Sequence, residues 1–359
     1  MHLGLGIAAA LCLLASLIPL LPIPHGAVRM FDFARLQILA FSAATLVLAA
    51  ALLPFDTAAI VIIGAALAAA AIQIVHVIPF TPVWPTQTAR YEGADGTADF
   101  LSLLVSNVKQ SNRDYDKLCA VVAEEKPDIA VFMETDPGWA KGLRPVLDDF
   151  AETVECPLDN SYGMIVASRL KLREAGVQHL LNDEVPSISI KAETRGGAPL
   201  RLIALHPEPP IPTNDTMGRD AEILVAGRMA RKETLPTIVT GDLNDVAWSR
   251  TTRRFLRISR LLDPRQGRGT YNSFDARYPL LRWPLDHIFH SREFELVDIR
   301  RLPFVGSDHF PMYYRFALVP VDRNDPPEKP SEDDREEARD IIRTEKSRDR
   351  EPIGTDWET

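Results

Sequence analysis

The chain has 359 residues and a net charge of −9, so it is longer than one average domain. Its mean hydropathy of −0.05 averages three unlike parts, which are an apolar start, a globular middle and a polar end. Most of the net charge lies in Pro320–Thr359, which holds 8 basic and 14 acidic residues, and the nearly balanced remainder argues against a domain that holds long nucleic acid by charge alone.

Three apolar runs occupy the first 84 residues, at about 3–23, 36–54 and 57–80. Each is close to the roughly 20 residues that a helix needs to cross the bilayer. A cleaved signal peptide is the alternative for the first run, but Met1–His2–Leu3 lacks a positive charge and two more runs follow. We therefore expect an integral membrane protein with three transmembrane helices. Two spans remain open, because the middle run is short and the alanine-rich third run also suits a core helix.

The loops between these runs carry few charges with which to orient the chain. The first loop holds Arg29 and Arg35 around Asp32, and the second holds only Asp56. Because positive loops tend to stay in the cytoplasm, three spans place the C-terminal domain in the cytoplasm, and two spans reverse this. Residues 85–99 then form a proline-containing linker.

A strand, a helix and a second strand follow the linker. The apolar run Phe100–Val105 predicts a buried strand with Asn107 just beyond its end, and an amphipathic helix begins near Asp114. A second strand, Ile129–Met133, ends at Glu134. This order predicts a βαβ unit whose polar residues emerge at strand ends, where α/β proteins place their sites.

Further apolar runs predict consecutive strands that are partly antiparallel. They cover Met164–Ala167, Ser187–Ala192 and Leu200–Leu205, and Gly196–Gly197 suits a hairpin turn between the last two. His206 leaves the last of these strands and enters a proline-rich loop. A functional histidine and an ordinary loop histidine both fit this position.

The next strand ends in a second polar motif. Helical spacing covers Asp215–Ala230, and the run Leu235–Thr240 then breaks at Gly241. Asp242 and Asn244 follow two residues apart, so in extended chain their side chains point the same way. One can accept a proton or face a cation and the other can donate a hydrogen bond. A plain turn uses the same residue types, so the motif alone does not decide between them.

The last apolar runs predict the remaining strands of the globular block. They cover Leu285–Phe289, which includes Asp286, then Phe294–Ile299, and Phe310–Phe316 after the polar stretch Ser307–His309. The tail from Pro320 contains few apolar residues. We therefore expect residues 320–359 to be disordered, with at most a solvated helix and no catalytic role.

Taken in order, six short stretches resemble the endonuclease/exonuclease/phosphatase family. They read "SNVKQSNRDY", "PDIAVFMETD", "ALHPEPP", "TGDLNDVAWS", "PLDHIFHS" and "VGSDHFPM". The resemblance spans residues 100–319 and implies a four-layer α/β sandwich, in which two packed mixed sheets are flanked by helices. The whole layout is similar to membrane-anchored bacterial members, which implies the bacterial inner membrane.

The resemblance also implies a site that holds Mg²⁺, with Mn²⁺ as the alternative. Hard oxygen ligands suit both ions, whereas the three cysteines show no metal-binding spacing. By resemblance Glu134 is the metal ligand, with Asn107 beside it and Asp308 nearby. The cation would face the phosphoryl oxygens of an anionic phosphate ester.

The remaining roles implied by the resemblance concern the water and the phosphate. Asp242 would orient or deprotonate the attacking water, and Asn244 would hold that water or a phosphoryl oxygen. A histidine beside a carboxylate would contact the phosphate, and a second histidine would assist. The expected catalytic, orienting and substrate-defining residues in this group are His309 with Asp286, His206 with Glu155, and Tyr271, Arg282 and Trp283.

The sequence therefore predicts a membrane-anchored, metal-dependent phosphoesterase. Its expected partners are the lipid bilayer and a phosphate ester, which is a nucleic acid, a phospholipid or a small molecule. A catalytically silent membrane protein that uses the same fold for binding is the alternative. The intact set of acid, amide and imidazole side chains favours the enzyme.

Overall fold

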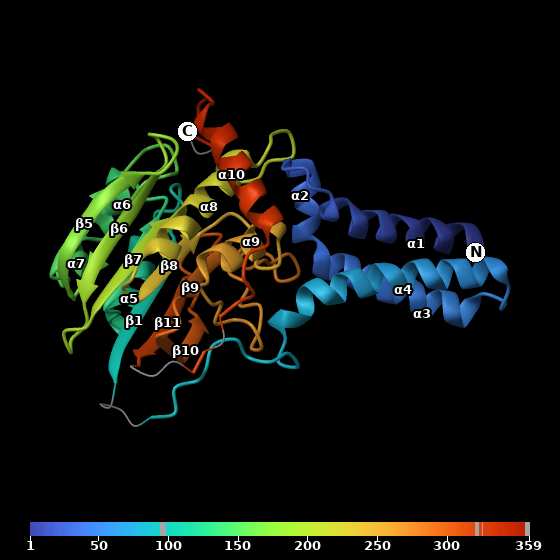
Figure 1. The fold of residues 1–359 in the computed structure, drawn as a ribbon, viewed down its shortest axis with the longest axis horizontal. Coiled ribbons are helices and arrows are strands. Elements are labelled where there is room, and N and C mark those ends of the chain that lie inside the picture. The colour runs from blue at the N-terminus through green and yellow to red at the C-terminus, as the bar shows by residue number, and fades with distance from the viewer. Residues whose placement is uncertain (94–97, 320–322, 325, 356–359) are drawn as a thin grey trace.

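The computed structural model describes residues 1–93, 98–319, 323–324 and 326–355. A bundle of N-terminal helices extends from an α/β domain that contains the strands β1 to β11 of the described residues (Figure 1). The N-terminus lies at the far end of this bundle. The end of the described chain lies on the α/β domain (Figure 1).

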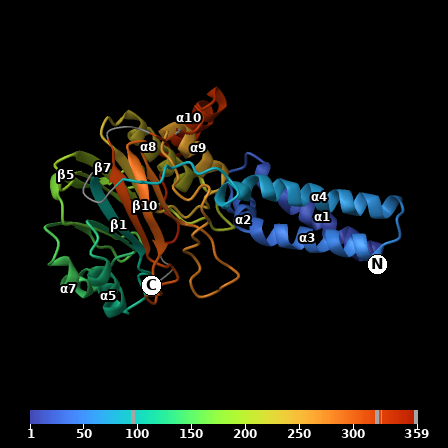
Figure 2. The same cartoon turned by 90° about the horizontal axis from the view of Figure 1, so that it is seen from below.

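Four α-helices form the N-terminal region. They are α1 His2–Leu17, α2 Gly26–Phe33, α3 Arg35–Leu52 and α4 Thr57–Val77, with the 3₁₀ turns Ile18–Leu20 and Ile78–Phe80 extending α1 and α4. Three segments are long and apolar enough to cross a membrane, namely His2–Leu20, Arg35–Leu52 and Thr57–Phe80. These match the three expected runs. The sequence did not predict α2, which joins the first two candidate spans at the α/β domain (Figure 2).

The three long helices pack through small side chains along most of their length. Ala9, Ala49 and Ala66 are buried where the helices meet, together with Ile62. Small residues allow helix backbones to approach closely, which is the usual basis of packing in lipid. The bundle therefore needs few polar contacts away from the α/β domain.

Polar contacts concentrate at the end of the bundle nearest the α/β domain. Arg35 pairs with Asp32 at 2.6 Å and donates to Gln73 Oε1 at 3.0 Å, and Gln73 donates to Ser16 Oγ at 2.8 Å. Arg29, which the orientation argument counted with Arg35, is also buried. Both arginines are therefore buried at the end of the bundle nearest the α/β domain. The expected orientation in the membrane stays a prediction.

The α/β domain contains two sheets. The first has the order β10-β11-β1-β2-β4-β3, and the second has the order β5-β6-β7-β8-β9. Parallel and antiparallel neighbours occur in both, because β1 pairs with β2, and β7 with β8, in parallel. The strands are β1 Asp99–Asn107, β2 Ile129–Met133, β3 Glu152–Cys156, β4 Met164–Ser168, β5 Lys171–His179, β6 Pro186–Glu193, β7 Pro199–Leu205, β8 Thr237–Asp242, β9 Asp286–His290, β10 Phe294–Arg301 and β11 Met312–Leu318.

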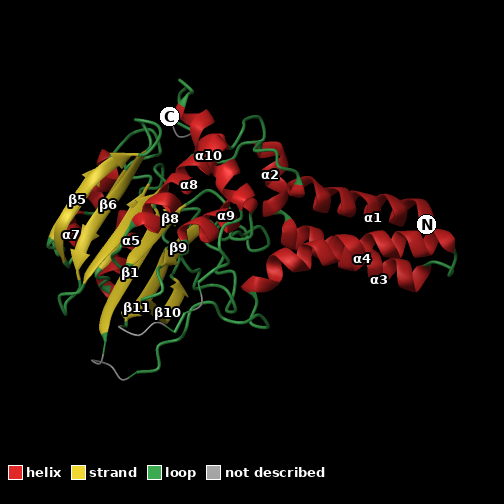
Figure 3. Ribbon diagram, in the orientation of Figure 1, coloured by secondary structure: helices red, strands yellow, loops and turns green. Residues whose placement is uncertain are grey.

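The sheets pack face to face and helices cover their outer faces (Figure 3). One apolar core fills the space between the sheets, and a further core lies beneath the helices on each outer side. The helices are α5 Tyr115–Glu125, α6 Pro137–Gly142 and α7 Arg144–Leu147 on the first sheet, and α8 Met217–Lys232 and α9 Arg250–Ser259 on the second. This is the expected four-layer α/β sandwich.

Strand direction brings the polar motifs to one end of the sandwich. The parallel strands β1, β2, β7 and β8 end there, and the antiparallel strands β9 and β11 begin there. Asp242 at the end of β8 lies opposite Asp286 at the start of β9. Residues far apart in the sequence therefore meet at one edge.

Gly241 is required where β8 approaches β7. Its φ is +140°, and a Cβ atom there would lie 1.9 Å from the carbonyl oxygen of Leu205. Only glycine fits this conformation without a clash. The glycine that breaks the predicted strand thus allows Asp242 to reach the strand end.

The tail is not disordered where the structure describes it. Helix α10, Glu332–Lys346, begins with a capping box at Ser331 and buries Ala338 and Ile342 against α8 and α9. Arg257 on α9 donates to Asp334 at 2.6 and 2.7 Å. For α10 the expectation of disorder was wrong, because the acidic face of the tail meets a basic helix, whereas residues 320–322, 325 and 356–359 lie outside the described residues.

Candidate active site

A pocket of about 380 Å³ opens at the end of the sandwich where the polar strand ends meet. Its size suits a small ligand or one group of a larger ligand. Its lining includes six of the predicted site residues. The lining residues are Phe33, Lys109, Glu134, Ser161, Tyr162, His206, Pro209, Pro210, Asp242, Asn244, Phe274, Leu285, Asp308, His309 and Gly354.

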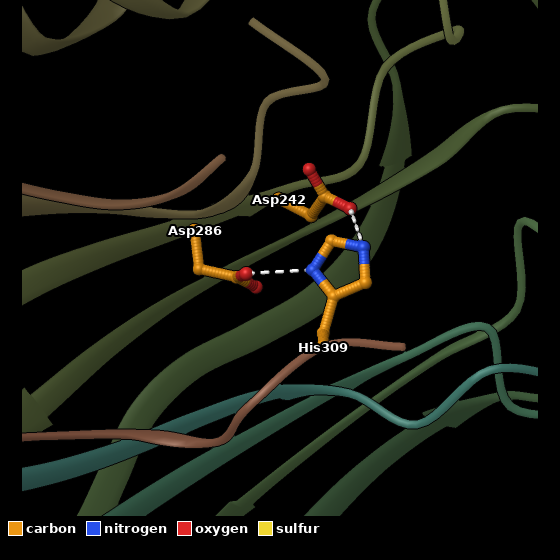
Figure 4. A group of neighbouring side chains, drawn as sticks. All are labelled: Asp242, Asp286 and His309. Carbon is orange, nitrogen blue, oxygen red and sulfur yellow. Dashed lines mark hydrogen bonds and ion pairs between the residues drawn. The ribbon is translucent and has the colours of Figure 1, made fainter. Parts of the chain in front are cut away.

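An imidazole lies between two buried carboxylates at the base of this pocket (Figure 4). His309 Nδ1 is 2.7 Å from Asp286 Oδ2, and His309 Nε2 is 3.4 Å from Asp242 Oδ2. The backbone amide of His309 donates to Ser307 Oγ, and this hydrogen bond holds the backbone that carries the imidazole. The expected pairing of Asp286 with His309 is therefore present.

This environment favours the protonated imidazole. Burial by itself lowers the pKa of His309, but the charges of Asp286 and Asp242 outweigh it and raise the pKa to about 10. An opposite charge within hydrogen-bond distance stabilises the charged form of a histidine. His309 thus presents a positive charge to the pocket at neutral pH.

Glu134 stands at the end of β2, beside Asn107 at the end of β1. Asn107 Nδ2 donates to Glu134 Oε1 at 2.6 Å and to Asp242 Oδ2 at 3.0 Å. Its oxygen accepts from the backbone amide of Lys109 at 2.9 Å, which fixes the amide orientation. Asn107 therefore lies beside Glu134, as expected, and positions two carboxylates.

Burial and two nearby carboxylates disfavour the charge of Glu134. Desolvation raises the pKa of Glu134 to about 7, the hydrogen bond from Asn107 and the charge of His309 oppose this, and the charges of Asp308 and Asp242 add to the rise. A hard divalent cation would relieve this repulsion, and carboxylate oxygens are its preferred ligands. The residues present therefore fit Mg²⁺ or Mn²⁺.

A second grouping also satisfies the distances of a metal site. Ligand atoms of Asp242, Asp286 and His309 lie within 4.8 Å of one another. However, both ring nitrogens of His309 already face carboxylates, so a metal would have to displace a charge-assisted pair. Glu134 is the better candidate ligand.

His206 and Asn244 form the opposite side of the base. His206 Nε2 lies 3.4 Å from Asn244 Nδ2, 3.8 Å from Glu134 and 3.9 Å from Asp242. Burial lowers the pKa of His206 to about 4, partly opposed by Asp242. The two histidines of the site therefore carry different charges at neutral pH.

Asp308 lines the pocket but pairs with a cation of the chain. Lys109 Nζ donates to its carboxylate at 2.8 Å, and Arg277 lies 3.6 Å away. Asp308 is thus engaged by positive side chains in this arrangement. The sequence missed Lys109, although it stands only two residues after Asn107.

Four pocket residues have backbone conformations that most side chains avoid. Lys109, Glu134, Ser161 and Asn244 have φ values of +58°, +61°, +66° and +50°. Such conformations cost energy and tend to cluster at functional sites. The strand ends here are therefore shaped to aim particular side chains into the pocket.

The structure places three further predicted residues away from the pocket lining. Glu155 lies on β3 and accepts from Arg144 at 2.5 Å, so its carboxylate does not orient His206. Tyr271 packs against the core between the sheets, and Arg282 donates to two backbone carbonyls and covers Phe310. These residues do not line the pocket, because strand position and local turns direct them elsewhere.

Trp283 contributes indirectly, by supporting the pocket wall. Its ring stacks on Phe274 at 6.1 Å and meets Phe33 edge-on at 6.0 Å, and both of these line the pocket. The C-terminal segment also supplies Gly354 to the lining. No local sequence signal marked Phe33 or Gly354 as site residues.

A larger cavity of about 700 Å³ lies at the other end of β8, near Thr237. Many arginines line it, and it lacks the carboxylate and imidazole cluster of the first pocket. The smaller pocket is therefore the better candidate for catalysis.

Comparison with known proteins identifies the family of the chain. The model of the endonuclease/exonuclease/phosphatase family matches residues 104–309, which is more than half of the chain. The chain belongs to this family. A search of the curated proteins finds no match.

Solved structures show the same fold at low sequence identity. Zebrafish (D. rerio) TDP2 in complex with a single-strand DNA product is 18% identical, with a TM-score of 0.51, over 60% of this chain and 98% of that chain. The family protein from Bacteroides thetaiotaomicron is 18% identical, with a TM-score of 0.50, over 63% and 100%. The human Nocturnin catalytic domain with bound sulfate is 15% identical, with a TM-score of 0.50, over 62% and 98%. These identities show the fold alone.

Proposed function

We propose that this family member is a membrane-anchored, divalent-metal-dependent phosphoesterase. The observation that carries the proposal is the Asp286–His309–Asp242 arrangement beside Glu134 in one pocket. Hydrolysis of a phosphate ester requires that negative charge on the phosphate is neutralised and that the attacking water is oriented. An imidazolium and a cation-binding carboxylate can meet these two requirements.

Glu134 would hold the metal ion, and Asp308 lines the same pocket. Bound Mg²⁺ or Mn²⁺ supplies a positive charge that polarises the phosphoryl oxygens. The role of Asn107 is to hold the carboxylate of Glu134 in place through its 2.6 Å hydrogen bond. This arrangement limits the motion of the ligand before a cation arrives.

The other residues act on water and phosphate. Asp242 accepts from Asn107 and from the backbone amide of Asn244, and these two hydrogen bonds orient its carboxylate in the pocket to take a proton from water. The His309 imidazolium, held by Asp286, would stabilise the phosphate by its positive charge as negative charge builds on the phosphoryl oxygens. Neutral His206 adds a ring nitrogen that can form a hydrogen bond, and it brings no second positive charge to the phosphate.

The test uses the purified full chain with a soluble phosphodiester and a soluble phosphomonoester, bis(p-nitrophenyl) phosphate and p-nitrophenyl phosphate. We expect hydrolysis of at least one ester with Mg²⁺ or Mn²⁺ and its loss in a chelator. Full activity in the chelator would contradict the metal assignment. Hydrolysis of neither ester, and of no lipid ester, would contradict the proposed activity.

Anchoring has a separate test. We expect membranes washed with alkaline carbonate to retain the full chain, because three helices have the length and apolar character of spans. Release of the chain by carbonate would show that these helices pack on the surface of a membrane or protein.

A further inference from the structure

One wall of the pocket belongs to the helix that joins the first two candidate spans. Phe33, the last residue of α2, lines the pocket. The candidate span Arg35–Leu52 begins two residues later. The pocket therefore lies beside the base of the helix bundle.

A loop on one side of the pocket mouth is fastened to the same helix. Gly26, the first residue of α2, donates to the carbonyl oxygen of Asn214 at 2.8 Å. The loop that precedes Asn214 contributes Pro209 and Pro210 to the pocket lining. Both ends of α2 thus contact the pocket or a loop that borders it.

On the other side, aromatic rings connect α2 to the catalytic imidazole. Trp283 Nε1 donates to the carbonyl oxygen of Phe33 at 2.5 Å, and its ring stacks on Phe274. The Phe274 ring lies 4.8 Å from that of His309. The wall between the bundle and His309 is therefore apolar.

An exposed apolar loop, Tyr278–Leu281, lies at the level of the bundle's base. Gln37 in the first turn of α3 donates to the carbonyl oxygen of Leu280 at 3.2 Å, and the loop projects beside the start of α3 (Figure 2). The side chains of Tyr278, Leu280 and Leu281 are 55%, 87% and 47% exposed. At 1.5 Å per residue, Gln37 lies only about 3 Å along the span from Arg35.

This location indicates that the lipid bilayer covers the exposed side chains of the apolar loop. Leucine side chains exposed to water gain free energy when apolar material covers them, and tyrosine suits the membrane interface. The loop is continuous with helices that have the character of membrane spans. A protein inserted to the depth of α3 would place Leu280 among lipid molecules.

We propose that the apolar loop enters the bilayer surface and that the pocket takes the phosphate group of a membrane lipid. This inference rests on the proposed phosphoesterase activity and names its substrate class. Lys109 and His309 face the anionic phosphate, while Phe33 and Phe274 face the apolar part of the lipid. Water attacks phosphorus, the P–O bond to the lipid breaks, and the leaving oxygen takes up a proton.

The experiment compares lipids with their water-soluble head groups. The full chain is reconstituted in phosphatidylcholine vesicles that contain phosphatidic acid or phosphatidylglycerol, and the soluble counterparts are glycerol 3-phosphate and glycerophosphoglycerol. We expect kcat/KM for at least one lipid to exceed that of its counterpart by tenfold or more. A single-stranded oligonucleotide serves as the competing macromolecular substrate.

Two variants of Leu280 test the loop itself. We expect Leu280→Asp to lower hydrolysis of the vesicle lipid by about tenfold, the scale of one buried leucine, and to leave hydrolysis of bis(p-nitrophenyl) phosphate unchanged. The matched control Leu280→Phe should preserve both activities. Because Leu280 is 87% exposed, neither change disturbs the core.

The outcomes separate this inference from the proposed activity. Equal kcat/KM for lipid and head group, a preference for the oligonucleotide, or an equal loss of both activities in Leu280→Asp would each overturn the lipid inference. Hydrolysis of the p-nitrophenyl ester without any lipid hydrolysis would overturn it while leaving the phosphoesterase proposal intact. Absence of all hydrolysis would overturn both.

Discussion

The pocket has two regions of different origin and character. Its floor comprises Glu134, His206, Asp242, Asp286 and His309, which stand at strand ends inside the family match or directly support that edge. Its rim includes Phe33 from the N-terminal helices and Gly354 from the C-terminal segment, both outside residues 104–309. The family core therefore supplies charge, and the two extensions shape the entrance.

This difference separates the chemistry of the pocket from access to it. The floor lies at the ends of strands in two packed sheets, where His206, Asp242, Asp286 and His309 are buried. The rim depends on how segments outside the family match dock on the core. Changes in the floor should alter the rate of reaction, whereas changes in the rim should alter stability or substrate choice.

The largest effect is expected for Glu134→Gln. A neutral amide is a poorer ligand for a hard cation, and a metal ion contributes several kcal/mol to the reaction, so kcat/KM should fall by about 10³. Titration of Mg²⁺ against both proteins measures the effect. An unchanged dependence on Mg²⁺ in the variant would show that Glu134 does not hold the metal.

The next effect concerns the imidazolium of the floor. We expect His309→Ala to lower kcat by on the order of 10², the scale for loss of one transition-state donor, with metal affinity nearly unchanged. Asp286→Asn should produce a related defect. The double variant should lose less than the product of the two single losses, because the two side chains act as a unit. Strictly multiplicative losses in this cycle would mean that the pair is not coupled.

The pH profile gives a third comparison within the floor. The pKa of His309 is about 10 in the folded chain and about 6.5 in the unfolded chain. Its stabilising contribution is therefore complete below pH ~6.5 and is lost as the pH rises towards 10. We expect kcat to fall on the alkaline side near pH 10. Asp286→Asn should shift this fall to a lower pH by about one unit or more, since the substitution removes a charge that raises the pKa of His309. An alkaline limb that does not move would exclude His309 as its source.

The floor could be predicted from the sequence because its signals are local. An apolar run followed at once by a polar side chain, as at Met133–Glu134 and Gly241–Asp242, marks a strand end in an α/β fold. Which strand ends meet depends on strand order, and the order of the motifs in the family supplied that information. Glu155, which was expected to orient His206, does not line the pocket because its strand, β3, lies at the edge of its sheet.

The rim could not be predicted, because the segments that form it dock through partners far away in the sequence. The C-terminal segment follows α10, which docks on α9. Helix α9 is rich in arginine and α10 is rich in acidic residues, and each sequence alone resembles a solvated segment. Together, Arg257 pairs with Asp334 and Arg250 donates to Glu337 at 2.8 and 2.9 Å. The capping box at Ser331 and the spacing of Ala338 and Ile342 were the available signals for a docked helix.

The smallest effect is expected where the C-terminal segment fastens to the rim. Arg350 donates to both oxygens of Glu208 at 2.7 and 2.8 Å, and the amide of Ile353, next to Gly354, donates to the same carboxylate at 3.2 Å. The Glu208 side chain is only 5% exposed, and Arg350 is its cationic partner. Tyr162, which lines the pocket, donates to the carbonyl oxygen of Ile353 and ties the segment to the pocket wall.

Removing the Arg350 side chain would leave the Glu208 carboxylate buried without its cation. We expect Arg350→Ala to lower the free energy of unfolding by about 1–3 kcal/mol, measured by thermal or chemical denaturation. The matched control is Arg343→Ala on α10, because Arg343 and its partner Asp340 are 80% and 63% exposed, and such pairs contribute roughly 0–1 kcal/mol. Since no floor residue contacts Arg350 in the described hydrogen bonds, kcat for a small soluble ester should stay within about twofold. A loss of kcat in Arg350→Ala as large as that in His309→Ala would mean that the C-terminal segment takes part in the chemistry, and the division between floor and rim would not hold.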